Sequence, residues 1–321
     1  MRLTIATRQS QLALWQAEWV QDLLSQHPEV KSVELLPLVS RGDKILDAPL
    51  AKVGGKGLFV KELEEAMLEG AADLAVHSMK DVPMAFPKGL SLSAILERAS
   101  PFDALVSNDY AAFADLPKNA VVGTSSLRRQ AQLLRQRPDL DIRFLRGNVN
   151  TRLAKLDKGE YQAIILAEAG LIRLGFGDRI AHALDPELIL PAAGQGAVGI
   201  ETRTSSSPRD SKIQSIVRSL QHTPTALSVL AERGVITRLN GGCQVPIGAF
   251  CRISPSKHAD HTHTLSLQAL VCDETGQQII SANDQLNCAQ ESQAFDLGYK
   301  LGGMLIDNGA DKILAKYGMN V

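Results

Sequence analysis

Short apolar runs alternate with segments of helical periodicity over about the first two hundred residues of the chain. A strand-like run at 3–6 opens the pattern. Leu12, Trp15 and Trp19 then recur near helical spacing, with Ser10 in position to cap the helix. Alternating strands and helices are typical of parallel sheets with helices on both faces. We therefore expect two α/β lobes, from about 1–100 and 100–195, with a cleft between them.

The same patterns predict the remaining elements of these two lobes. Ser125 or Ser126 is expected to cap a helix that Pro138 ends. The further strands are expected at 33–39, 73–77, 90–96, 104–106, 121–123, 142–145 and 163–167, and the further helices at 59–68, 127–136 and 149–156.

The pattern changes after the polar segment TSSSPRD (204–210), which predicts a surface loop. Strands then follow one another without long helices between them, which indicates a small α+β domain. We expect three domains: 1–100 with 195–217, 101–194, and 218–321. The expected elements of this last part are helices at 211–221, 225–239 and 290–308, and strands at 245–252, 264–271 and 278–282.

Basic and hydroxyl side chains follow five of the predicted strands, and a glycine-rich loop at 42–57 adds two lysines. Ligands of open α/β sheets bind beyond the carboxyl ends of the strands. Any one of these residues, taken alone, is more typical of a solvated surface than of a binding site. Their recurrence favours a site for a small ligand with several carboxylates or phosphates. The residues are Arg8, Lys52, Lys56, Ser78, Lys80, Thr124, Ser126, Arg128, Arg129, Arg146, Arg152 and Arg173.

Asp81 and Cys243 differ from these cations. Asp81 is an acid among bases, so it is either an ion-pair or capping residue or a carboxylate ready to stabilise a cation or move a proton. Cys243 lies in a glycine-rich turn, where a cysteine is exposed enough to react. The alternative for Cys243 is a residue with no chemical role.

Composition excludes several other classes of protein. The net charge of -1 disfavours a nucleic-acid partner. No apolar run approaches the roughly 20 residues of a membrane helix, and the N-terminus lacks the features of a signal peptide, so we expect a cytoplasmic protein. The four cysteines form no CxxC pair, and the polar turn with His258, His261 and His263 is expected to be a solvated loop, so no metal is predicted.

Several distinctive motifs occur together, and on them the chain resembles the porphobilinogen deaminases, also called hydroxymethylbilane synthases. The resemblance runs nearly end to end. The motifs are IATRQS (5–10), AKVGGKGLFVKELE (51–64), HSMKDVP (77–83), GTSSLRR (123–129), RGNVNTR (146–152), PAAGQGAVGIE (191–201) and GGCQVPIG (241–248).

The resemblance implies two lobes like those of periplasmic binding proteins, and a third α+β domain whose cysteine, here Cys243, carries a dipyrromethane cofactor through a thioether. Four porphobilinogens would be added in turn, each losing ammonia, and water would release hydroxymethylbilane. Asp81 matches the catalytic aspartate, and the family is expected to be monomeric, with neither nucleic acid nor membrane as partner.

The resemblance also divides the other site residues between cofactor and substrate. Each pyrrole ring carries an acetate and a propionate, which suits a cationic site. The implied cofactor residues are Cys243, Asp43, Ser78, Lys80, Thr124, Ser126, Arg128, Arg129 and Arg146, and the implied substrate residues are Arg8, Ser10, Lys52, Lys56, Phe59, Arg152, Arg173 and Gln195.

Two positions depart from the family pattern: Asn240 stands where Glu usually precedes GGC, and Glu168 stands where a small or apolar residue is common. The main alternative function is a non-enzymatic protein of the same two-lobed fold that binds a polycarboxylate. Such a protein would need neither Cys243 in an exposed turn nor Asp81 among cations.

Overall fold

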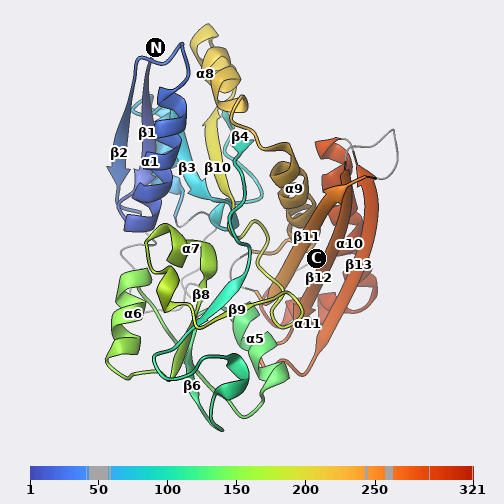
Figure 1. The fold of residues 1–321 in the computed structure, drawn as a ribbon. Helices are drawn as coiled ribbons and strands as arrows, with labels where there is room; N and C mark the ends of the chain where they lie inside the picture. The colour runs from blue at the N-terminus through green and yellow to red at the C-terminus, as the bar shows by residue number, and fades with distance from the viewer. Residues whose placement is uncertain are drawn as a thin grey trace. The chain divides into compact units, whose positions relative to one another are not determined.

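A computed structural model describes residues 1–40, 42, 57, 59–242, 245–256, 263–288, 290–319 and 321. The described residues group into two compact units. The first unit holds the described residues of 1–99 together with Ala197–Ala226, and the second holds those of Ser100–Gly196 and Leu227–Val321. Figure 1 shows the elements of both units.

The first unit is built on a five-stranded sheet in the order β2-β1-β3-β10-β4. Helices α1 and α8 share one apolar core with one face of the sheet, and α4 packs on the other face. The bounds are β1 (Arg2–Arg8), α1 (Gln11–Ser25), β2 (Ser32–Leu38), α4 (Lys61–Leu68), β3 (Leu74–Ser78), β4 (Leu90–Ile95), β10 (Val198–Arg203) and α8 (Pro208–Arg218).

This unit has two apolar cores, one on each face of its sheet, because successive side chains of a strand point to opposite faces. In β1, Leu3 and Ile5 join the core under α1 and α8, whereas Ala6 joins the core under α4. Ser10 begins α1 by accepting a hydrogen bond from the Ala13 amide at 3.4 Å. The predicted cap at Ser10 is therefore confirmed.

The second unit contains a five-stranded sheet in the order β7-β6-β8-β5-β9. Alternate residues of β8 again face two cores, Ile165 toward α5 and Ile164 toward α6 and α7. The bounds are β5 (Asp103–Val106), β6 (Val121–Gly123), α5 (Leu127–Gln136), β7 (Asp141–Arg143), α6 (Val149–Asp157), β8 (Ala163–Ala167), α7 (Glu168–Arg173) and β9 (His182–Leu184).

Both sheets are mixed, so the expectation of parallel sheets is wrong. In the first, β10 runs antiparallel to β3 and β4. In the second, β5 runs antiparallel to β8 and β9. β5 and β10 are each the first strand after the chain passes from one unit to the other. Each runs antiparallel to its neighbours in the sheet. The strands β9 and β10 were not predicted from the sequence.

A three-stranded antiparallel sheet, β11-β12-β13, forms the C-terminal part of the second unit. Helix α10 crosses α9 so closely that a Cβ on Gly298 would overlap the Ala231 carbonyl oxygen. The predicted fold class, two α/β lobes and a small C-terminal α+β part, is confirmed, and the boundaries of three domains stay a prediction. The bounds here are α9 (Thr223–Arg238), β11 (Ile247–Pro255), β12 (His263–Cys272), β13 (Ile279–Cys288), α10 (Glu291–Asp307) and α11 (Ala310–Ala315).

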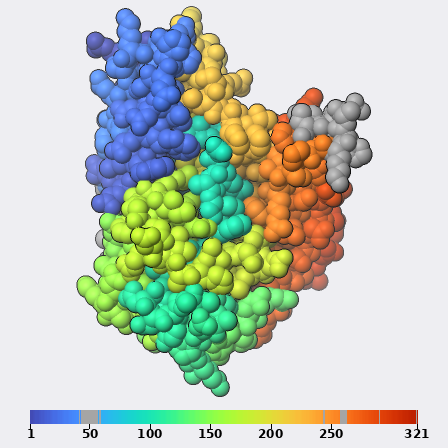
Figure 2. All heavy atoms as spheres, viewed as in Figure 1, coloured from blue at the N-terminus to red at the C-terminus, as the bar shows by residue number. Residues whose placement is uncertain are grey.

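This C-terminal sheet docks on the rest of the second unit at two places. The turn between β12 and β13 meets α5, where a Cβ on Gly276 would overlap the Ala131 carbonyl oxygen. The Ala249 amide of β11 donates to the Pro191 carbonyl at 3.0 Å. In Figure 2 the yellow-green atoms of the segment after β9 lie against the orange atoms of the C-terminal sheet.

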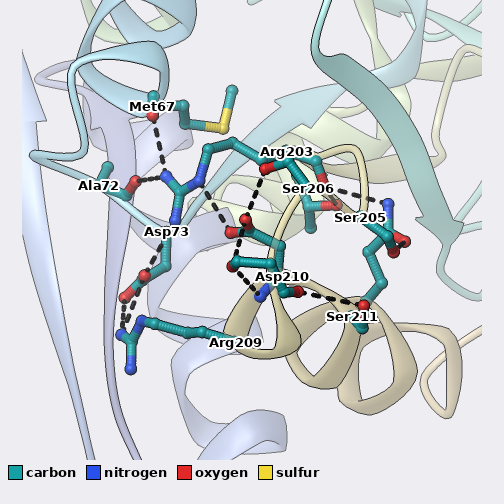
Figure 3. A network of polar contacts seen from close by, with 12 residues as sticks. Met67, Ala72, Asp73, Arg203, Ser205, Ser206, Arg209, Asp210 and Ser211 are labelled. Carbon is teal, nitrogen blue, oxygen red and sulfur yellow. Dashed lines mark hydrogen bonds and ion pairs between the residues drawn. The ribbon is translucent and has the colours of Figure 1, made fainter.

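A network of ion pairs closes the end of the first sheet where β3 begins (Figure 3). Arg203 donates to Asp210 at 2.9 Å, and Arg209 to Asp73 at 3.0 Å. Asp210 belongs to α8, which Ser207 caps from inside the predicted surface loop. This network lies at the opposite end of β3 from Asp81, so it secures the sheet without taking part in the site.

Candidate functional site

Four predicted site residues, Asp43, Lys52, Lys56 and Cys243, lie outside the described residues, as do His258 and His261. His263 opens β12. The other predicted site residues fall into two groups, one in each unit.

In the first unit, Arg8 is the last residue of β1 and Ser10 follows the strand. The Arg8 guanidinium lies 4.3 Å from the centre of the Phe59 ring, so the cation and the aromatic face are in contact. Ser10 uses its side-chain oxygen as the cap of α1. The structure thus brings Arg8 and Phe59 together.

The segment after β3 is held from both faces of the sheet. On one face Ser78 exchanges hydrogen bonds with Gln16 of α1 at 2.9 and 3.1 Å. Met79 is buried against Gly199 of β10, where a Cβ would overlap its sulfur. A single 3-10 turn, η1 (Met79–Asp81), then carries Lys80 and Asp81, both half-buried, beyond the end of the strand.

On the other face, a buried hydrogen bond between His77 and Glu201 holds the same segment. His77 Nε2 lies 2.9 Å from Glu201 Oε2 of β10, and both side chains are almost fully buried. Glu64 of α4 is buried near them, and burial together with the charge of Glu201 raises the pKa of Glu64 to about 7. The segment that leads to Asp81 is therefore held by contacts with two other elements, α1 and β10.

In the second unit, Asp103 gathers three of the predicted site residues. Arg128 donates to its carboxylate at 2.7 Å, Arg129 at 2.7 and 3.0 Å, and Gln195 at 2.9 Å. Burial alone would raise the pKa of Asp103, but the charges of the two arginines and the hydrogen bonds hold it well below its usual range. Asp103 stays ionised and orients both guanidiniums.

Arg146 and Arg152 extend this cationic group. Burial, and then the like charges of Arg129 and Arg146, lower the pKa of Arg152 to about 10. Arg152 donates from Nε to the Gly147 carbonyl at 2.8 Å. Three guanidiniums thus lie close enough to repel one another, and an anionic ligand would relieve that repulsion.

Arg173, Thr124 and Ser126 complete the predicted residues of this unit. Arg173 donates to the Gly196 carbonyl at 2.8 Å, and burial lowers its pKa to about 10. Ser126 caps α5 by accepting from the Arg129 amide at 3.4 Å, which selects it over Ser125 as the cap. Thr124 Oγ1 accepts from the Ser126 amide at 3.2 Å.

Two family models match the chain over most of its length. The model "porphobilinogen deaminase, dipyromethane cofactor binding domain" matches residues 3–211, and the model "porphobilinogen deaminase, C-terminal domain" matches residues 226–307. The chain belongs to the porphobilinogen deaminase family. The resemblance stated from the motifs is thereby confirmed.

Solved structures with a similar fold share little sequence with this porphobilinogen deaminase family member. The VFT2 domain of BvgS from Bordetella pertussis is 16% identical, over 68% of this chain and 86% of that one, with a TM-score of 0.41. A YaeC-family lipoprotein from Enterococcus faecalis is 14% identical over 70% and 94%, with a TM-score of 0.43. The aliphatic sulphonate binding protein SsuA from Escherichia coli is 17% identical over 74% and 70%, with a TM-score of 0.39.

As a porphobilinogen deaminase, the protein is a transferase of tetrapyrrole synthesis that joins porphobilinogen units on a dipyrromethane cofactor. The residues present fit that group, since the buried Arg129 and the half-buried Arg146 and Arg152 form a cluster of like charge, and the cofactor and substrate both carry carboxylates. Across the described residues we find neither a metal-binding group of His, Cys, Asp and Glu nor a helix able to span a membrane.

Both departures from the family pattern have a local setting. Asn240 adopts a left-handed backbone (φ 46°) just after α9, a conformation that Asn tolerates better than Glu. Glu168 begins α7, and its carboxylate accepts a hydrogen bond from Ser100. The left-handed backbone therefore accommodates Asn240, and the hydrogen bond from Ser100 accommodates Glu168.

Asp103, Glu64 and Glu201 were not predicted from the sequence as site residues. Asp103 precedes the apolar run 104–106, and Glu201 lies in a strand whose other residues are mostly buried. A charged residue within a buried strand needs a partner, and that signal was available in the sequence. The identity of the partners was not, because they come from distant segments.

Proposed function

We propose that the reaction of this porphobilinogen deaminase depends on Asp81 as the catalytic carboxylate. It stands beyond β3, where His77, Ser78 and Met79 are each held by another element. Loss of ammonia from porphobilinogen leaves positive charge on the substrate, and an ionised carboxylate stabilises that charge and accepts hydrogen bonds from pyrrole N–H groups. A carboxylate held in a fixed position can stabilise this charge and accept these hydrogen bonds with little reorganisation.

The arginines bind the acetate and propionate groups in this proposal. Arg128 and Arg129 are oriented by Asp103, and Arg146, Arg152 and Arg173 present further guanidinium N–H groups. Arg8, Ser10, Lys52, Lys56, Phe59 and Gln195 are proposed to contact substrate, and Asp43, Ser78, Lys80, Thr124 and Ser126 the cofactor. The observation that carries the proposal is the group of guanidiniums around Arg152, in which Arg129 is buried and Arg146 and Arg152 are half-buried.

Cys243 is proposed as the attachment point of the cofactor, through a thioether. The GGCQVPIG motif supports this assignment. The other three cysteines, Cys251, Cys272 and Cys288, are all buried, which also favours Cys243. When bound, dipyrromethane supplies the free pyrrole carbon to which the first substrate unit is joined. Burial raises the pKa of Cys272 to about 12, which makes that thiol unreactive at neutral pH.

The intact mass of the denatured protein tests this attachment. We expect an excess over 34.6 kDa equal to two porphobilinogen-derived units, located in the peptide that contains Cys243. A Cys243→Ser variant should lack this excess, whereas a Cys251→Ser variant should keep it. A bare mass that stays bare after incubation with porphobilinogen, or an adduct on another residue, would contradict the proposal.

We also propose that the protein is a cytoplasmic monomer, as its family resemblance suggests. Cell fractionation and light scattering test these two statements separately. The alternative of a non-enzymatic polycarboxylate-binding protein is not favoured by any of the findings, and release of ammonia from porphobilinogen by the purified protein would exclude it.

A further inference from the structure

Three buried titratable side chains lie on the α4 face of the first sheet, and the proposed mechanism leaves them unused. They are Glu64 of α4, His77 of β3 and Glu201 of β10. Glu64 is 8% exposed, His77 5% and Glu201 1%, so all three are cut off from solvent. Charges in such a place must be compensated by one another.

The sheet register brings His77 and Glu201 together. β3 and β10 are antiparallel neighbours in which Gly199 pairs with His77 and Glu201 with Ala75. His77 and Ala75 point to the same face, so Glu201 and His77 are diagonal neighbours, and their side chains meet at 2.9 Å. Helix α4 covers this face, with Leu63 and Met67 packed in the same apolar core as Ala75.

Two carboxylates, those of Glu64 and Glu201, are buried on the same face. Their like charges repel when both are ionised, and a proton on Glu64 removes that repulsion. Within the described part of the chain, Glu64 Oε1 and Glu201 Oε1 are buried and accept no hydrogen bond. A protonated Glu64 removes one of these two buried anionic acceptors.

The groups that act on Glu64 come from each element around it. His77 of β3 lowers its pKa, Glu201 of β10 and Glu65 of its own helix raise it, and burial raises it most, to about 7. From β1, the residue in the core beneath α4 is the apolar Ala6. The effects of burial and of the two carboxylates, which raise the pKa of Glu64, therefore outweigh the effect of the His77 imidazole, which lowers it.

We propose that Glu64 is a positioning residue for the 77–81 segment: its neutral form keeps the His77–Glu201 pair in place, and loss of its proton disturbs that pair and lowers activity at alkaline pH. This inference rests on the proposed role of Asp81. His77 is four residues before Asp81. The His77–Glu201 contact holds the segment on the α4 face of the sheet, and the Ser78–Gln16 contact holds it on the opposite face.

Glu64→Gln tests the inference, because glutamine imitates the protonated side chain and does not titrate. The measurement is kcat/KM for porphobilinogen across neutral and alkaline pH, expressed as the ratio of variant to wild type. We expect this ratio to rise several-fold along a one-proton curve with a midpoint of about 7. Glu69→Gln, which removes an exposed carboxylate at the end of the same helix and does not act on Glu64, is the matched control and should give a flat ratio.

A flat ratio for Glu64→Gln would overturn the inference, since a purely structural role changes activity equally at every pH. If the wild type itself releases no ammonia from porphobilinogen, the proposed function fails instead. Carbon NMR of the wild-type holoenzyme with labelled glutamate needs neither activity nor a folded variant. One carboxyl should titrate near 7, and titration of every glutamate near its ordinary value would contradict the inference.

Discussion

Asp81 is the residue on which the proposed chemistry depends most directly. Its carboxylate is carried on one 3-10 turn after β3, and Ser78, Met79 and His77 hold that turn through contacts that do not involve the Asp81 side chain. Asp81→Asn should therefore keep the fold and the cofactor. We expect turnover to fall by about 100-fold or more, the scale on which charge stabilisation and proton transfer contribute.

Steady-state release of ammonia measures this loss, and the intact mass of the same sample shows that the cofactor is still attached. Asp109→Asn removes an exposed carboxylate elsewhere and should leave turnover unchanged. Near-normal turnover in Asp81→Asn would remove Asp81 from the mechanism.

At the scale of elements, the end of α9 leads directly into the GGC motif. Asn240 takes a left-handed conformation there (φ 46°), which costs a residue such as Glu about 1 kcal/mol more than Asn or Gly. Asn240→Glu, which restores the usual family residue, should lower the free energy of unfolding by about that amount. Asn240→Gly should cost less. Denaturant unfolding of the two variants checks the order, and equal losses would show that backbone strain is not the reason for Asn here.

At the scale of the whole molecule, the C-terminal sheet docks on α5 and so lies in one compact unit with the arginines of that helix. Gly276 makes this contact possible, since it has φ 72° and no room for a Cβ beside the Ala131 carbonyl. Gly276→Ala should destabilise the protein by more than the roughly 1–2 kcal/mol that a left-handed alanine costs.

Gly159→Ala is the matched control for Gly276→Ala. Gly159 has nearly the same backbone (φ 75°) in the same unit but open space around it, so the variant carries only the conformational cost. Thermal unfolding measures the difference between the two variants, which isolates the docking contact. Equal shifts in melting temperature would mean that the turn moves away from α5 at no cost.

Periodicity and caps alone were enough to predict most elements of this protein. The helix at 127–136 and the strands at 121–123 and 163–167 were predicted with the observed bounds, because their signals are local: a serine cap, an apolar run, a proline. The family followed from short motifs, whose residues are contiguous and so can be compared without a structure. Arg128, Arg146 and Asp81 were singled out because they follow predicted strands.

Only the tertiary structure decided which groups meet. Strand direction in β5 and β10 depends on how the chain crosses between units, which no local pattern encodes. Asp103 and Arg128 are 25 residues apart and His77 and Glu201 are 124 apart, so their pairing depends on sheet order. Burial, which raises the pKa of Glu64 and lowers that of Arg152, is likewise a property of the packed chain, because it requires other segments to exclude water.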